Sequence, residues 1–293
     1  MRRSLGIALA VGLSCPAAAE APAPCETLVR VLEASVGQKL TAPPAATRDG
    51  WCVLDGARTT GEGAVRASAE QLRVRGEASD DGLVSLEIEG KGLRAAAALN
   101  DRDLPDWLRD LLRLQTAEVH LALRRDEAAD RLDLDLGQVR LSGGGELSVT
   151  AEIADGHLSA ASLLTGRVTK LSVEWKNDGR FLRPMMEAWG ERLEPGSTGT
   201  RAVLAARAAL VRLVEAMPEG SLLDGTLEGA EAFIAAMPQG RGRLEALLRS
   251  DNGIGAAQLG LLALSQDPTG PETMARLFAG TEISVSWTPG ITP

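Results

Sequence analysis

The side chains that could carry out acid–base chemistry are few in this sequence and lie far apart. The chain has two histidines, His120 and His157. A catalytic triad needs a histidine beside a nucleophilic serine and an acid, and the Gly-X-Ser-X-Gly nucleophile pattern does not occur. We therefore expect both histidines to have ordinary surface roles, and two-residue alternation places His120 on a polar strand face with Glu118 and Arg124.

Two pairs of carboxylates recur at a spacing of two residues. Glu87 pairs with Glu89, and Asp133 with Asp135. Residues two apart share a face of a strand, and paired carboxylates can hydrolyse glycosides when a cleft and aromatic platforms hold the sugar. A solvated sheet face explains the same alternation more simply. Zinc would need three or four ligands at useful spacing, and the sequence shows no such set. The expectation is no catalytic, cofactor-binding or metal-binding residue, and no cofactor.

A third candidate is the Met185–Met186 pair, which lies close to Phe181 and Trp189. Flexible methionines beside aromatic rings can line an apolar pocket. The same spacing also fits a helix that packs its apolar face on the sheet, and we favour this second interpretation.

The amino terminus reads as an export signal. Arg2 and Arg3 precede the apolar run Leu5–Leu13, and three alanines precede Glu20. This pattern predicts a cleaved signal peptide over 1–19 and a periplasmic protein. An uncleaved buried helix is one alternative, and a lipoprotein acylated at Cys15 is another.

The two cysteines that follow the signal are Cys25 and Cys52. In an exported chain such a pair favours a disulfide. Free thiols that bind metal or carry out redox chemistry are the alternative, and they lack a close partner cysteine or histidine.

Short segments of alternating polarity dominate the middle of the chain, and each places its apolar residues on one face of a strand. The five clearest segments are Leu86–Ile88, Val119–Leu123, Leu132–Leu136, Leu147–Ile153 and Leu171–Trp175. A further strand is expected at Val65–Arg75, and a helix across the sheet at Leu104–Leu114. We predict one antiparallel sheet that is apolar on one side.

The last third of the sequence changes to helical periodicity. The pattern predicts an apolar helix face with Met185, Met186 and Leu193, and a second helix with Leu204 turned inward. A third helix is expected at Leu227–Met237, and further short helices at Ile254–Leu264 and from Pro271 onward. Arg243–Leu248 fits either a strand or a helix, and Ile283–Trp287 predicts a final strand.

The predicted fold class is α+β, a curved antiparallel sheet of amphipathic strands packed by C-terminal helices. The β-rich part covers 20–178 with an N-terminal helix. The helix-rich part covers 179–293, and the final strand makes one continuous domain of the two.

Composition narrows the range of partners. The formal net charge is −9, and aromatic residues make up 3% of the chain with no tyrosine. An acidic protein repels phosphate backbones, so we expect no nucleic-acid partner. The apolar run near the amino terminus is shorter than the roughly 20 residues of a membrane span, so we expect no stable transmembrane span.

The order of elements from Leu171 to Leu193 is strand, Asn-Asp-Gly, amphipathic helix. A helical hairpin follows, with a late strand at Ile283–Trp287. This order resembles AsmA-like envelope proteins and related poorly characterised periplasmic proteins of proteobacteria. The resemblance implies a curved sheet with an apolar groove, and it identifies no functional residue.

An apolar sheet face must be covered by helices, a second sheet, a partner or a ligand. The sequence thus favours a non-enzymatic periplasmic envelope protein that binds a lipid, another apolar ligand or an envelope protein partner on its one-sided sheet. An exported hydrolase with a dispersed site around His157 is one alternative. A purely structural envelope assembly factor with a solid core is another.

Overall fold

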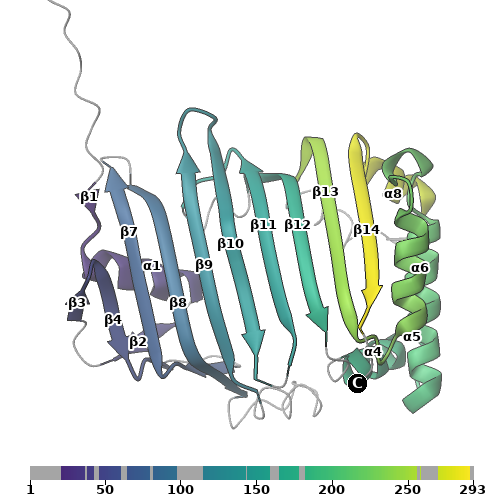
Figure 1. Cartoon of the computed structure of the whole chain (residues 1–293), viewed down its shortest axis with the longest axis horizontal. Helices are drawn as coiled ribbons and strands as arrows, with labels where there is room; N and C mark the ends of the chain where they lie inside the picture. Colours follow the sequence, from purple (N-terminus) through teal and green to yellow (C-terminus); the bar gives the residue numbers. More distant parts are fainter. Residues whose placement is uncertain are drawn as a thin grey trace, which may run out of the picture.

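The computed structural model describes residues 21–290 apart from 37, 43–45, 61–64, 80–81, 98–114, 143, 159–164, 178–181, 256–257 and 259–269. An open antiparallel sheet dominates this part of the chain, and helices lie at its two ends (Figure 1). The fold is α+β, as predicted, and the sheet is its larger component.

The long strands lie side by side in the order of the chain (Figure 1). They are β7 (Gln71–Ser79), β8 (Gly82–Ala97), β9 (Ala117–Asp126), β10 (Arg131–Leu141), β11 (Glu146–Ala154), β12 (Arg167–Asn177), β13 (Gly242–Gly255) and β14 (Thr281–Pro289). Each is antiparallel to the next. The five predicted segments are confirmed as parts of β8 to β12.

The register pairs apolar residues with apolar residues on one face of the sheet and polar residues with polar residues on the other. Val149 of β11 lies opposite Val173 of β12, and the next residues, Thr150 and Ser172, lie opposite each other. Because successive side chains point to opposite faces, one face collects the valines and leucines and the other collects the polar side chains.

The sheet continues through the last third of the chain. Arg243–Leu248 lies in β13, which settles the choice between strand and helix, and the predicted strand Ile283–Trp287 is confirmed within β14. β13 pairs with both β12 and β14, so both halves of the sequence contribute to one sheet. The helix expected from Ile254 is wrong at its start, because Ile254 and Gly255 end β13.

The N-terminal part forms a small layer around one helix. It consists of β1 (Ala21–Pro22), α1 (Cys25–Val36), β2 (Lys39–Thr41), β3 (Ala46–Arg48), β4 (Trp51–Asp55), β5 (Arg58–Thr60) and β6 (Val65–Ser68). Leu28 of α1 is buried in one cluster with Val74 and Leu86 of the sheet. A disulfide joins Cys25 to Cys52, with the Cα atoms 5.4 Å apart. The predicted disulfide thus fixes α1 to β4.

The single strand predicted over Val65–Arg75 is divided in two. β6 pairs with the end of β8, and β7 pairs with its first two thirds. Gly92 has a φ of +59° and lies between these two pairing regions. Glycine readily adopts a positive φ, so β8 can bend at Gly92 and pair with both β6 and β7.

The C-terminal helices gather beside β14 (Figure 1). They are α4 (Leu182–Leu193), α5 (Gly199–Glu215), the 3-10 turn η1 (Glu219–Ser221), α6 (Thr226–Ala236) and α8 (Pro271–Leu277). Phe233 of α6 contacts Trp175 of β12 and Trp287 of β14, with ring centroids 6.1 and 5.0 Å apart. This aromatic contact attaches the helices to the sheet.

Small residues allow α4 and α5 to approach closely, and Leu182 and Met186 of α4 pack with Val203 of α5 beside them. Met185, Leu193 and Leu204 were expected to face inward, but their exposed fractions are 42%, 46% and 55%. A Cβ atom on Gly190 would lie 1.8 Å from the carbonyl oxygen of Ala202. Because the helices approach this closely, the buried positions of α5 are Ala202, Val203 and Ala206, and Leu204 lies outside the contact.

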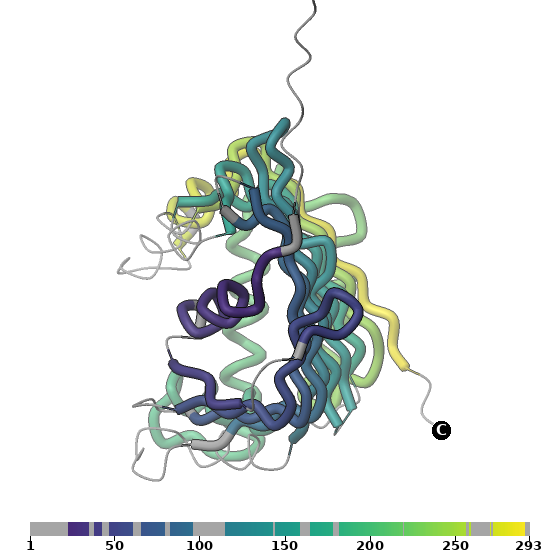
Figure 2. The backbone as a smooth tube through the Cα atoms, turned by 90° about the vertical axis from the view of Figure 1, so that its left-hand side faces the viewer, coloured from purple at the N-terminus to yellow at the C-terminus, as the bar shows by residue number. Residues whose placement is uncertain are grey.

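The sheet is curved, and its apolar face is the concave one. α1 lies on the concave side in Figure 2 and packs against Val74 and Leu86, whose side chains belong to the apolar face. α5 runs along the same side at the opposite end of the sheet (Figure 2). The predicted helix over Leu104–Leu114, the signal segment 1–19 and Cys15 lie outside the described residues.

Candidate functional site

The middle strands carry a row of aliphatic side chains on the concave face. We call this row the concave apolar surface. It consists of Val119, Leu121, Leu123, Leu134, Val139, Val149, Ile153, Leu171 and Val173. Strands β9 to β12 hold them, and the pairing registers place them on the same face as Val74 and Leu86. The surface thus follows from the two-residue periodicity of the sequence.

The ends of this face are covered, and its middle is less so. Under α1, Val74 is fully buried and Leu86 is 6% exposed. At the other end, Phe233 of α6 lies between Trp175 and Trp287. In contrast, every member of the concave apolar surface is only half-buried, although Leu132 and Ala151 on the same face are buried among them. Accessible aliphatic area over several adjacent strands is typical of a binding surface.

One cation lies at the end of this row. Arg125 of β9 is opposite Leu132 of β10, and two-residue alternation puts it on the same face as Leu123. Its Nε atom is buried and has no hydrogen-bond partner within the described residues. Its guanidinium forms a long ion pair of 3.9 Å with Asp130. A buried guanidinium N–H without an acceptor is unfavourable, so an anionic group would be accepted here.

The convex face is polar and its charges are paired across the strands. Examples are the ion pairs Arg73–Glu89, Arg140–Glu118, Lys170–Glu152 and Arg243–Glu174. Such cross-strand pairs at the surface contribute little each, about 0–1 kcal/mol. They nevertheless keep the convex face of the sheet solvated. The concave, apolar face is therefore the one that must be covered.

The two carboxylate pairs that the sequence singled out belong to these ion pairs. Arg131 Nε lies 2.7 Å from Asp133, and Arg124 Nε lies 3.6 Å from Asp135. Glu87 and Glu89 are bound by Arg75 and Arg73 in the same way. Each carboxylate thus neutralises a guanidinium beside it.

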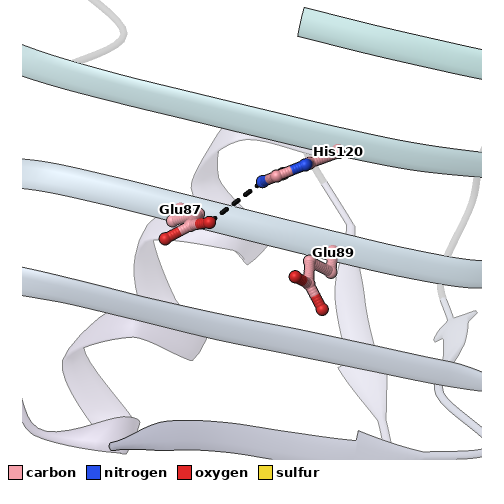
Figure 3. Close-up of side chains that lie close together, drawn as sticks. All are labelled: Glu87, Glu89 and His120. Atoms are coloured by element: carbon pink, nitrogen blue, oxygen red, sulfur yellow. Dashed lines mark hydrogen bonds and ion pairs between the residues drawn. The ribbon is translucent and has the colours of Figure 1, made fainter. Parts of the chain in front are cut away.

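His120 lies close to Glu87 and Glu89, as Figure 3 shows. Its Nε2 atom is 2.9 Å from Oε1 of Glu87, and its Cα partner across the strands is Glu89. Burial raises the pKa of Glu87, but hydrogen bonds from His120 and Arg75 lower it by more, so the pKa of this carboxyl lies below its usual value. Glu87 is therefore ionised at neutral pH.

The sequence placed His120 on a wet face with Glu118 and Arg124, and its proximity to Glu87 and Glu89 was missed. The only signal available in the sequence was that each of these residues falls on the polar face of its own strand. The register between β8 and β9 decides which of them meet, and the alternation within one strand carries no information about that register.

The remaining candidates are not members of this group. His157 is exposed and follows a turn at Asp155–Gly156. Met186 is buried in a cluster with Leu182 and Val203. The packing interpretation of the methionine pair is therefore confirmed for Met186, but its main partner is α5 together with Trp175, not the open sheet.

No helix within the described ranges is both long and apolar enough to cross a membrane. Comparison with protein-family models and with curated protein sequences finds no match to this chain.

Proposed function

We propose that the protein is a non-enzymatic envelope protein of the periplasm that binds the aliphatic chain of a lipid on its concave apolar surface. The observation that carries the proposal is the row of half-buried leucine, isoleucine and valine side chains on β9 to β12, between the regions covered by α1 and α6. The surface continues without a break from strand to strand, which suits a long and flexible apolar ligand.

The residue types favour an aliphatic ligand over an aromatic or sugar ligand. The concave apolar surface contains no aromatic ring and no hydroxyl group, so it offers neither stacking platforms nor hydrogen bonds. Four strands spaced by about 4.8 Å extend over roughly 15 Å. About ten methylene groups lying across them would contribute about 8 kcal/mol before the entropy of immobilisation is subtracted. The expected Kd is therefore micromolar or weaker.

Arg125 suggests what the polar end of this ligand carries. It lies at the end of the aliphatic row, and its buried Nε has no acceptor within the described residues. A carboxylate or phosphate head group would supply a charge-assisted hydrogen bond there. A fatty acid or an anionic phospholipid is thus the preferred ligand class.

The non-enzymatic assignment is supported by the separation of the titratable groups. His120 pairs with Glu87 on the convex face, and His157 is exposed in a different part of the chain. Neither histidine lies on the concave apolar surface. The periplasmic location is supported by the signal-like amino terminus and by the disulfide between Cys25 and Cys52.

Lipid extraction tests the proposal. The protein is purified from the periplasm and studied by native mass spectrometry, and its organic extract is analysed for lipids. Leu171→Asp places a charge on the apolar surface, and Ser172→Asp places the same charge on the opposite face of β12. We expect the wild type and Ser172→Asp to carry about one lipid per chain, and Leu171→Asp to carry at least about tenfold less, because a charge in an apolar site is unfavourable.

Thermal unfolding of both variants separates loss of binding from loss of folding. A milder change, Leu171→Ser, keeps the test valid if the aspartate variant does not fold. Wild-type protein that carries no lipid and takes up none from vesicles would overturn the proposal.

A further inference from the structure

The convex face holds a group of side chains that the proposed function does not use. One carboxylate oxygen of Glu87, one of Glu89 and one ring nitrogen of His120 all lie within 4.8 Å of one another. The three side chains are half-buried, and Figure 3 shows the ring of His120 directed at Glu87, with Glu89 next along β8. We propose that Glu87, Glu89 and His120 bind a first-row divalent cation such as Zn²⁺.

The ligand types suit such an ion. Imidazole nitrogen and carboxylate oxygen are both regular ligands of zinc, with bonds of about 2.0–2.2 Å. Ligand atoms around a tetrahedral ion with these bonds lie about 3.4 Å apart. The present separations of up to 4.8 Å therefore require movements of about 1 Å, which the rotatable side-chain bonds of two glutamates can supply. Water would complete the coordination.

The arginines beside the site hold the outer oxygens and leave the inner ones for the metal. Arg75 donates to Oε2 of Glu87, and Arg73 donates to Oε2 of Glu89 at 2.9 Å. Oε1 of Glu87 is hydrogen-bonded to Nε2 of His120 at 2.9 Å, and both atoms would exchange this bond for bonds to the metal. Oε1 of Glu89 accepts no hydrogen bond from the described residues. Hydrogen bonds to the outer atoms of metal ligands are the usual way in which proteins orient them.

Trp51 fixes these two arginines in turn. The guanidinium carbons of Arg73 and Arg75 lie 4.4 and 4.5 Å from the ring centroid of Trp51, which is 6% exposed. Stacking on a buried indole holds each guanidinium in place. The carboxylates are thus oriented before a metal arrives, which lowers the entropy lost on binding.

The positive charge of the arginines opposes the cation and limits its affinity. Two arginines balance two glutamates, so the ion must gain its stability from direct bonds and not from net charge. The imidazole of His120 supplies a metal–nitrogen bond, which a group of arginine–carboxylate ion pairs without a histidine could not provide. For this reason His120 is the side chain on which binding depends most.

The test uses tag-free protein treated with a chelator and then titrated with Co²⁺ and Zn²⁺. Isothermal titration measures the stoichiometry, and the visible absorption of bound Co²⁺ reports its ligands. We expect one ion per chain, and a loss of affinity of at least about tenfold in both His120→Gln and Glu89→Gln.

Matched controls come from the same chain. His157→Gln removes the other histidine, and Glu245→Gln removes a carboxylate that pairs with Arg243 on the convex face without a nearby histidine. Both should bind the metal as the wild type does. Zn²⁺ should also raise the Tm of the wild type and not that of His120→Gln.

A wild type that binds no ion at millimolar Co²⁺ or Zn²⁺ would mean that the group is an ion-pair ladder only, and would overturn the proposal. Equal binding by the wild type and His120→Gln would overturn it as well. Lipid binding is measured separately on the other face, so either result leaves the proposed function open to its own test.

Discussion

The backbone carbonyl of Val285 in β14 lies directly against Gly229 of α6. A Cβ atom on Gly229 would come within 2.2 Å of that oxygen, and Thr226, one turn earlier, donates a hydrogen bond of 3.1 Å to the carbonyl of Ile283. β14 is the last strand of the sheet, and unpaired edge groups invite association with other chains. The absence of a side chain at Gly229 lets α6 cover this edge.

Gly229→Ala should therefore destabilise the protein although alanine favours helices. The added methyl group meets rigid backbone, and overpacking of this kind destabilises by about 1–3 kcal/mol. Urea unfolding measures the change. Gly220→Ala is the control, because its Cβ would meet open space, and its effect should stay within about 0.5 kcal/mol. Equal stability of the two variants would contradict the close contact.

Phe233→Ala should loosen the attachment of the C-terminal helices to the sheet. The ring touches both Trp175 and Trp287, and removing it should lower the free energy of unfolding by roughly 3 kcal/mol, the lower end for this substitution because Phe233 is only partly buried. Leu204→Ala, at a position 55% exposed, should change it by less than about 0.5 kcal/mol. A larger effect at Leu204 than at Phe233 would be inconsistent with the described packing of the helices.

Loss of the disulfide should destabilise the N-terminal layer and with it the covered end of the concave face. Cys25 and Cys52 are 27 residues apart, for which the loop-entropy model gives about 3.5 kcal/mol. Cys25→Ser/Cys52→Ser and reduced wild type should show the same lowered Tm. Peptide mapping without reductant checks the bond itself. A Tm unaffected by reductant would contradict the prediction.

The pH dependence of stability should involve Glu87. Although burial raises its pKa, hydrogen bonds from His120 and Arg75 lower it below the ordinary 4.5. A carboxyl whose pKa is lowered by folding stabilises the folded state above its unfolded value, and this contribution is lost as the pH falls through the folded value. Glu87→Gln should therefore flatten the stability curve below about pH 4.5, as unfolding at a series of pH values would show. Parallel curves for the two proteins would count against it.

Much of the sheet could be predicted from the sequence, because alternation within a strand decides which side chains share a face. Leu147–Ile153 and Leu171–Trp175 are examples, and both form strands with the predicted apolar face. What alternation cannot give is register between strands that are distant in sequence. This is why His120 was placed on the correct face but not beside Glu87.

Helices α4, α5, α6 and α8 were located correctly, but the orientation of α4 and α5 was partly wrong. Periodicity marks the most apolar stripe, and in α4 and α5 that stripe included Met185 and Leu204, which are exposed. The contact between these helices depends on Gly190 and Ala202. Close approach of two helix backbones requires small residues, and a hydrophobic pattern gives them little weight.

The position of a bound aliphatic ligand is the central point of the proposed function, and photo-crosslinking measures this position directly. A diazirine-bearing fatty acid is incubated with the wild-type protein and irradiated, and the adducts are mapped by mass spectrometry. We predict adducts on the concave apolar surface, above all at Val149 and Leu171, and a strong reduction when unlabelled fatty acid competes. Adducts confined to the exposed leucines of α4 and α5, Leu193 and Leu204, or no saturable labelling at all, would contradict the proposed binding surface.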